Sequence, residues 1–554
     1  MNAPGRLRPP PLPPLAPYRP FGQVPQSAPD ALGLQPTDLS SGLASLGLTQ
    51  DPKQAALGFA CDPTPLDDPI LVSVSPAASA LIGLKASDLL QSPGWQALLS
   101  GSATLAGQTS YASVYAGHQF GVFVPRLGDG RAINLGCVRG WELQLKGAGS
   151  TPYARHADGR AVLRSSIREF LCSEFMAALG VPTTRALSLV SARTPVFREA
   201  VETAAVVCRM APSFVRFGHF EYLASQGQTQ SLQQLIDHLV ATQPLFAQTA
   251  EEAPGSGRNW AFFSTVSLHT ARLMADWTAE GFMHGVMNTD NFSILGLTLD
   301  YGPFGWMEGF SAGHICNHTD SQGRYAFGQQ PSVGLWNLQR LLVALSTIDP
   351  GQPIEKRNEA LIEQYQQAFQ THFHHRMAKK LGLDPHLPTD QLESLLQGLY
   401  GLLSAKSCDF PTWMRNLSRV DLTVDPAEPS DFARAYGALA DHGLHHGDLV
   451  EWLQATRQAW NQSAASSPDL LQDPTSRRTA WQAALRRANP AFVLRNWVAQ
   501  EIIEAAQEGD WSALHDALVI LSNPFDDHLD KPHRQHWRNP PPDWAAHLEV
   551  SCSS

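Results

Sequence analysis

The chain has 554 residues, of which 43% are hydrophobic and 16% charged, so it can bury large cores and is not a disordered protein. Its formal net charge of −11 argues against a nucleic-acid surface, because contacts to phosphate backbones need an excess of Lys and Arg. It contains no run of about 18 apolar residues, so we expect no membrane-spanning segment.

The cysteines and the amino terminus favour a cytoplasmic protein of bacterial type. The seven cysteines are scattered and form no C-x-x-C pair, which favours a reducing compartment without structural zinc. The first thirty residues contain Arg6, Arg8 and Arg19 and no acidic residue before Asp30, as a mitochondrial transit peptide does. Their many prolines disfavour the amphipathic helix of such a peptide, so we favour an extended arm over a targeting signal.

Three short strands are expected between residues 117 and 146. They are the runs 119–127, 131–138 and 141–146, the last of which ends at Lys146. Gly128-Asp129-Gly130 joins the first strand to the second, and Arg139-Gly140 forms a tight turn between the second and the third. A lone Gly-Asp-Gly is usually only a turn, so a role as a phosphate cradle needs support from residues elsewhere in the chain.

A helix is expected over residues 160–179, with Asp158-Gly159 as its cap. Glu169 lies inside this helix among small side chains and has room to reach a partner. Alone, Lys146 and Glu169 would be read as solvated charges. The order glycine loop, strand lysine and helix glutamate is that of the protein-kinase small lobe, where the Lys–Glu pair aligns the nucleotide phosphates.

The second half of the chain is expected to be mostly helical. A long helix over 260–280 leads into His284-Gly-Val-Met-Asn-Thr-Asp290-Asn291, which is followed by Asp300-Tyr-Gly. This pattern is typical of the catalytic and metal loops of kinases, but Val286 stands where the catalytic Asp belongs. A valine can neither accept a proton nor bind a metal, so the chain is either an inactive kinase or a different nucleotide enzyme. Further helical stretches are expected at 333–347, 355–381, 389–404, 431–463 and 479–508.

These parts predict an α+β, protein-kinase-like bilobal fold. We expect a proline-rich arm over 1–65, a small β-rich lobe with one key helix over 66–235 and a large helical lobe over 236–400. Residues 401–554 exceed a minimal large lobe and are expected to form a helical extension with a cysteine-containing tail.

Several long strings in one order resemble the selenoprotein O family. They are Tyr115–Gly121, Leu145–Gly149, Asp158–Glu169, Val215–Glu221, His284–Asn291 and Asp300–Phe304, with a looser echo in the Ser-Cys-Ser-Ser end. The resemblance covers roughly residues 70–330. It implies a kinase-like protein adenylyltransferase that binds ATP in a flipped orientation and transfers AMP to the Ser, Thr or Tyr hydroxyls of proteins, with UTP as a further donor that the sequence does not exclude.

The resemblance also implies roles for individual residues. Asp290 would be the catalytic base, and Asn291 and Asp300 would hold Mg²⁺ or Mn²⁺, which prefer oxygen ligands. Without the family, Asp290 could equally cap a loop. The implied nucleotide-binding residues are Gly128, Gly130, Arg131, Lys146, Asp158, Gly159, Arg209, Arg216 and Asp300, with Glu169 paired to Lys146. Arg209 and Arg216 would clamp the terminal phosphates, although either alone would be read as a surface arginine.

The partners expected are ATP and protein substrates with hydroxyl side chains, and we expect a monomer that binds neither nucleic acid nor membrane. Cys316 and Cys552 could form a reversible, redox-sensitive disulfide or be two unrelated thiols. Two alternatives to AMP transfer stay open: an ATP-binding pseudokinase scaffold and a true kinase that transfers the γ-phosphoryl group.

Overall fold

The structure is a computed structural model that describes residues 26–27, 29–40, 42–48, 57–251, 255–351, 353–440, 442–465 and 473–550. Over these residues the chain forms a large antiparallel sheet and many helices, which is the mixed α+β class expected from the sequence. None of the helices described is long and apolar enough to cross a bilayer.

The strands, in chain order, are β1 (Gln26–Ser27), β2 (Leu39–Ser40), β3 (Gly58–Ala60), β4 (Ile70–Val74), β5 (Thr104–Leu105), β6 (Tyr111–Gln119), β7 (Val122–Gly128), β8 (Ala132–Val138), β9 (Trp141–Lys146), β10 (Ala161–Val162), β11 (Arg185–Phe197), β12 (Val201–Ala211), β13 (Phe282–Met283) and β14 (Gly305–Trp306). The main sheet has the order β3-β6-β8-β9-β12-β11-β4, with β2, β7 and β10 paired to β8, β6 and β12. Two short pairs, parallel β1–β5 and antiparallel β13–β14, lie apart from it.

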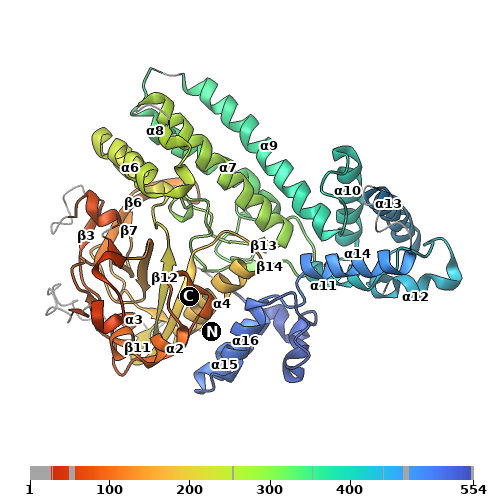
Figure 1. The fold of residues 1–554 in the computed structure, drawn as a ribbon, viewed down its shortest axis with the longest axis horizontal. Helices are drawn as coiled ribbons and strands as arrows, with labels where there is room; N and C mark the ends of the chain where they lie inside the picture. The colour runs from red at the N-terminus through yellow and green to blue at the C-terminus, as the bar shows by residue number, and fades with distance from the viewer. Residues whose placement is uncertain are drawn as a thin grey trace, which may run out of the picture.

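The α-helices are α1 (Pro76–Leu81), α2 (Ala86–Gln91), α3 (Pro93–Leu99), α4 (Leu163–Ala178), α5 (Phe217–Ser225), α6 (Thr229–Thr242), α7 (Ser256–Glu280), α8 (Gln330–Ser346), α9 (Ile354–Lys380), α10 (Thr389–Ala405), α11 (Phe410–Asn416), α12 (Pro429–Ala440), α13 (His446–Ala465), α14 (Pro474–Ala488), α15 (Asn496–Gln507) and α16 (Ser512–Ser522). Figure 1 shows α10 to α14 on the side of the molecule opposite the sheet. The chain then returns, and α15 and α16 pack against α4. The carboxyl-terminal helices therefore support the helix that carries Glu169.

Two of the three predicted strands are confirmed, and the first is wrong. β8 and β9 match the predicted runs 131–138 and 141–146 and pair through the turn at Arg139-Gly140. The predicted run 119–127 is instead a hairpin, because the chain reverses at Phe120 and Gly121, which have φ of +50° and +86°. The expected strand is thus the end of β6 followed by most of β7.

The predicted helix cap at Asp158-Gly159 is also wrong. α4 begins at Leu163, and residues 161–162 pair with β12 as the short strand β10. The predicted helices 431–463 and 479–508 are each two helices. The first breaks after α12 at Gly443, which has a φ of +69°, and the second breaks after α14 near Pro490.

The sheet starts before residue 65, where the amino-terminal arm was expected to end. β2 pairs with Val138 and Cys137 of β8, and β3 pairs with β6. The proline-rich residues 1–25 lie outside the described part of the chain.

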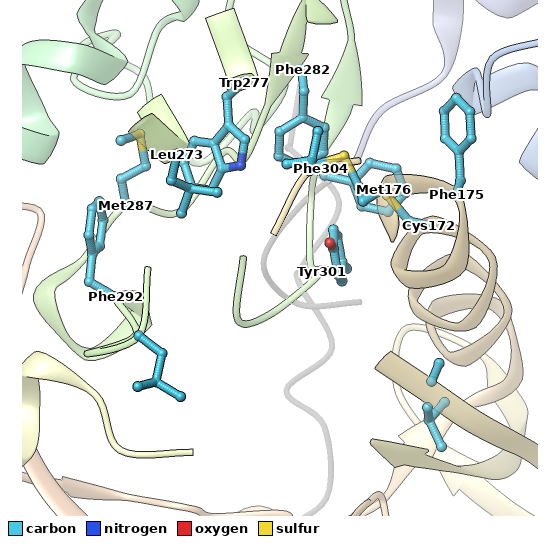
Figure 2. Close-up of a cluster of buried hydrophobic side chains, with 14 of the residues drawn as sticks. Cys172, Phe175, Met176, Leu273, Trp277, Phe282, Met287, Phe292, Tyr301 and Phe304 are labelled. Carbon is cyan, nitrogen blue, oxygen red and sulfur yellow. The ribbon is translucent and has the colours of Figure 1, made fainter. Parts of the chain in front are cut away.

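A hydrophobic cluster joins α4 to the loops that follow α7. Figure 2 shows Phe175 and Met176 of α4 on one side of this cluster and Trp277 of α7 on the other. Phe282, Tyr301 and Phe304 are among the cluster's buried members. Because packed cores resist deformation, this cluster holds the Asp300 loop at a fixed distance from α4.

Candidate active site

One cavity of about 380 Å³ gathers nearly all the predicted site residues. It lies between the sheet and the loops that follow α7. Its lining includes Gly128, Gly130, Arg131, Lys146, Asp158, Gly159, Arg209, Arg216, Asp290, Asn291 and Asp300. Glu169 does not line the cavity but contacts Lys146, which does. Cys316 lies outside the cavity, in a separate hydrophobic cluster.

Lys146, at the end of β9, joins the sheet to α4 and to the Asp300 loop. Its Nζ lies 2.7 Å from Glu169 Oε2 and donates a 2.5 Å hydrogen bond to Asp300 Oδ1. Arg209 of β12 donates to the same two carboxylates, at 3.2 Å to Glu169 and 2.5 Å to Asp300. Burial by itself raises the pKa of Asp300, but Lys146 and Arg209 outweigh it and hold that pKa well below its ordinary value. Asp300 is therefore a carboxylate at neutral pH, and both cations are held in place at the cavity wall.

Asp290 is a buried carboxyl group with one hydrogen-bonded oxygen. Gln119 donates to Oδ2 at 3.4 Å, whereas Oδ1 is buried without a hydrogen-bond partner among the described residues. Burial raises the pKa of Asp290 to about 6, against the opposing charge of Arg216. Unpartnered buried oxygens are costly and are found at functional sites. The group is thus a stronger proton acceptor than an exposed aspartate and is still largely ionised at neutral pH.

A buried network fixes the loop that carries Asp290. The Thr289 hydroxyl donates to Glu221 of α5 and accepts a 2.7 Å hydrogen bond from the backbone N–H of His118. The Glu221 carboxylate also bonds to His118 Nδ1 at 2.5 Å. Strand β6, helix α5 and the loop are therefore tied together one residue before Asp290.

Val286 contributes its backbone to the site. Its carbonyl accepts a 3.0 Å hydrogen bond from Asn291 Nδ2, which leaves the amide oxygen of Asn291 available to a ligand. Its N–H donates to His284 Nδ1 at 3.3 Å. His284 stacks on Trp277, and burial lowers the pKa of its ring to about 4. A neutral His284 thus shapes this loop and takes no part as a charged group.

Arg216 and the glycine loop together form a further part of the cavity wall. The guanidinium group of Arg216 donates to the Asp290 carbonyl at 2.9 Å and lies 4.7 Å from the Tyr115 ring centroid. Asp129, between the two loop glycines, accepts a 2.5 Å hydrogen bond from the Ser113 hydroxyl and lies 3.8 Å from Arg216. These contacts fix the glycine loop to β6 and orient Arg216 toward Asp290.

Asp158 and Gly159 line the cavity, although they do not cap α4. The Asp158 carboxylate binds both terminal nitrogens of Arg198, at 2.8 and 2.9 Å. Gly159 has a φ of +71°, and a side chain there would collide with the backbone of Gly149 and Ser150. The glycine is therefore required for the close approach of two chain segments.

The donor set fits a small divalent cation that is shared with a nucleotide. Asn291 and Asp300 offer an amide oxygen and a carboxylate, which suit magnesium when phosphates and water complete its coordination. No group of three or more His, Cys, Asp or Glu side chains that could hold a metal alone occurs among the described residues.

Cys316 lies outside the cavity, and Cys552 lies outside the described residues. Cys316 is buried, with its Sγ 3.6 Å from the Met283 carbonyl. The carboxyl-terminal segment does reach this region, because the His318 backbone N–H donates to the Val550 carbonyl at 3.2 Å.

Several residues of the site were not predicted from the sequence. Tyr115, Gln119 and Glu221 lie in strings that carried the family resemblance, but the strings gave them no role. Arg198 carried no local signal, because its partner Asp158 is 40 residues away.

The similarity to known sequences extends beyond residues 70–330, over which the resemblance was expected. Residues 59–522 match the family described as protein adenylyltransferase SelO. The chain is 46% identical over 497 residues to the protein nucleotidyltransferase YdiU of Dechloromonas aromatica, covering 89% of this chain and 94% of the relative. It is 45% identical over 518 residues to the YdiU protein of Variovorax paradoxus, covering 92% and 98%. The corresponding protein of Myxococcus xanthus is 44% identical over 505 residues, covering 90% and 96%. The chain therefore belongs to the SelO family of protein adenylyltransferases.

Proposed function

We propose that this protein transfers AMP from ATP to the Ser, Thr or Tyr hydroxyls of other proteins and releases pyrophosphate. The observation that carries the proposal is the pairing of a buried, partly unpartnered Asp290 with three cations, Lys146, Arg209 and Arg216, around one cavity. Names of the relatives, which are called protein nucleotidyltransferases, support the same reaction.

In the proposed reaction, the substrate hydroxyl oxygen attacks the α-phosphorus of ATP. A new phosphorus–oxygen bond forms, the bond from the α-phosphorus to the bridging oxygen breaks, and pyrophosphate leaves. Asp290 accepts the hydroxyl proton, for which its raised pKa suits it. Lys146, Arg209 and Arg216 neutralise the phosphate charge, and their fixed positions reduce reorganisation during the step.

Asn291 and Asp300 would hold Mg²⁺ or Mn²⁺, which would neutralise further phosphate charge when bound. Gly128, Gly130, Arg131, Asp158 and Gly159, which all line the cavity, would contact the phosphates. The two arginines would engage the terminal phosphates of an ATP bound in the flipped orientation. UTP could serve as an alternative donor at the same phosphate sites.

We further propose that the sheet region and the helices around α7 to α9 are the two lobes of a kinase-like fold, over about residues 66–235 and 236–400. The Lys146–Glu169 ion pair supports this assignment, since kinases use such a pair to align phosphates. Residues 401–554 would then be the helical extension, of which α15 and α16 brace α4.

The test is a parallel incubation with ATP labelled in the α- or the γ-phosphate, in the presence of protein acceptors. AMP transfer predicts that only the α label enters protein and that Asp290→Ala and Asp300→Ala abolish this labelling. Entry of the γ label would instead indicate a true kinase, and ATP binding without either transfer would indicate a pseudokinase. Either result would overturn the proposal.

A reversible disulfide between Cys316 and Cys552 is proposed as a redox control of this activity. Its formation would remove two electrons and two protons, which a peroxide or a small-molecule disulfide would accept. The contact between His318 and Val550 supports it, because each lies two residues from one of the cysteines. Equal sensitivity of wild type and Cys552→Ser to oxidant and reductant would contradict it.

A further inference from the structure

The turn between β6 and β7 is attached directly to the catalytic loop. Gln119 donates to the Asp290 carboxylate, and the backbone N–H of Phe120 donates to Asn288 Oδ1 at 3.1 Å. The same N–H also lies 3.1 Å from the Tyr325 hydroxyl. Anything that binds this turn is therefore held at a fixed position relative to Asp290.

This turn exposes apolar side chains beside the site. Val122 is 69% exposed, and Phe120 and Phe123 are both more than one-third exposed. Phe123 also contacts the His118 ring, at 5.0 Å between ring centroids. Strand β7 pairs with β6 and with no other described strand, so its second edge offers backbone hydrogen-bonding groups. Exposed apolar residues that gather on a free strand edge mark a surface for interaction.

Two arginines contact Trp336, which lies beside the same turn. The guanidinium carbons of Arg324 and Arg340 lie 4.7 and 5.1 Å from the Trp336 ring centroid. Neither arginine forms an ion pair within the described part of the chain. Trp336 contacts the His118 ring edge-on at 5.3 Å, and Arg324 borders Gly121 of the turn. In a protein of net charge −11, two cations without acidic partners indicate an acidic ligand.

We propose that this hairpin surface, formed by Phe120, Val122, Phe123, Arg324 and Arg340, docks the protein substrate. The segment that binds would be extended, with an apolar and an acidic side chain near the hydroxyl that receives AMP. Its backbone would pair with the free edge of β7, the apolar side chain would cover the turn, and the acidic one would meet the arginines. The inference rests on the proposed function, and it names the chemical features by which substrates are selected.

The experiment compares AMP transfer to two synthetic peptides by the full-length protein. Both peptides carry one target hydroxyl, one within a Phe- and Glu-containing sequence and the other with Gly and Gln at the same positions. We expect the wild type to show a kcat/KM ratio of about tenfold or more in favour of the first peptide, as burial of one large apolar side chain would give. Two further peptide pairs separate the two features: one pair differs only in Phe or Gly, the other only in Glu or Gln. Val122→Ser/Phe123→Ser should bring the kcat/KM ratio of the first pair near to one. Arg324→Gln/Arg340→Gln should bring the kcat/KM ratio of the second pair near to one.

The matched control is Val519→Ser/Leu529→Ser, which removes apolar side chains that are 50% and 78% exposed and do not line the cavity. It should retain the wild-type ratio. ATP binding and melting temperature, measured for every variant, show whether the fold and the nucleotide site are intact. The docking proposal would be overturned if the wild type transferred the α label equally well to both peptides. It would also be overturned if the hairpin variants kept the wild-type preference for the Phe- and Glu-containing peptide. A changed sedimentation coefficient in Val122→Ser/Phe123→Ser alone would assign the surface to a second copy and would also overturn it. Absence of α-label transfer by the wild type would instead overturn the proposed function and this inference with it.

Discussion

Replacement of Gly117 by alanine would add one methyl group to β6 directly against the carboxylate of Asp290, the proposed base. A Cβ atom at this position would lie 2.5 Å from Asp290 Oδ1 and 2.9 Å from its Cβ and Cγ. The carboxylate must then move by about 1 Å to regain ordinary van der Waals contact. Since a displacement of this size costs about 10²-fold in rate, we expect kcat for AMP transfer to fall about a hundredfold.

The assay is steady-state incorporation of α-labelled ATP into protein, together with a direct measurement of ATP affinity. ATP affinity should change little, because Lys146 and Arg209 do not contact Gly117. The added methyl group is expected to lower the free energy of unfolding by about 1–3 kcal/mol, so folding is checked by thermal melting. Gly401→Ala in α10 is the control, because its Cβ would meet nothing within 4 Å. A Gly117→Ala protein with wild-type kcat would refute the assignment of Asp290 as the base at this position.

Three further predictions concern single buried side chains. Asp290→Asn should abolish AMP transfer. It should also raise the free energy of unfolding at pH 7 by up to about 3 kcal/mol, because folding raises the pKa of this carboxyl group to about 6 and so disfavours its charged form. A variant that is no more stable in urea than the wild type would contradict this. Burial lowers the pKa of His219 to about 3. The stability that the neutral His219 ring contributes is therefore complete above pH 6.5 and is lost as pH falls toward 3. The stability advantage of wild type over His219→Asn in urea should therefore shrink by about 2 kcal/mol from pH 7 to pH 5, and a constant difference would refute it. Arg168 donates to the Asn496 side chain at 3.0 Å and to the Phe304 carbonyl, four residues after Asp300, at 2.8 Å. Arg168→Lys should disturb these hydrogen bonds, lower the free energy of unfolding by about 2 kcal/mol and lower kcat more than ATP affinity. A purely structural role would leave kcat unchanged in the folded fraction.

Local chemistry explains which elements could be predicted. β8, β9 and the turn at Arg139-Gly140 depend on neighbouring residues, and they occur where the sequence indicates them. β6 was missed because seven consecutive residues from Tyr111 are buried, so the strand lacks an alternating pattern. The cap at Asp158 was misread because the carboxylate binds Arg198 and residues 161–162 pair with β12. Both errors come from tertiary packing, which no local pattern records.

The family, the order of the site residues and the loss of the usual kinase base at Val286 can all be read from the chain, because motifs are properties of residues in order. The chain alone could not show that Lys146 and Arg209 share Asp300, a residue more than 90 positions from either, or that Gln119 and Gly117 contact Asp290. Those contacts depend on the packing of β6, β12 and the Asp290 loop around one hydrophobic cluster. It is this packing that buries Asp290, and burial, rather than any neighbouring residue in the chain, makes the carboxylate a strong proton acceptor.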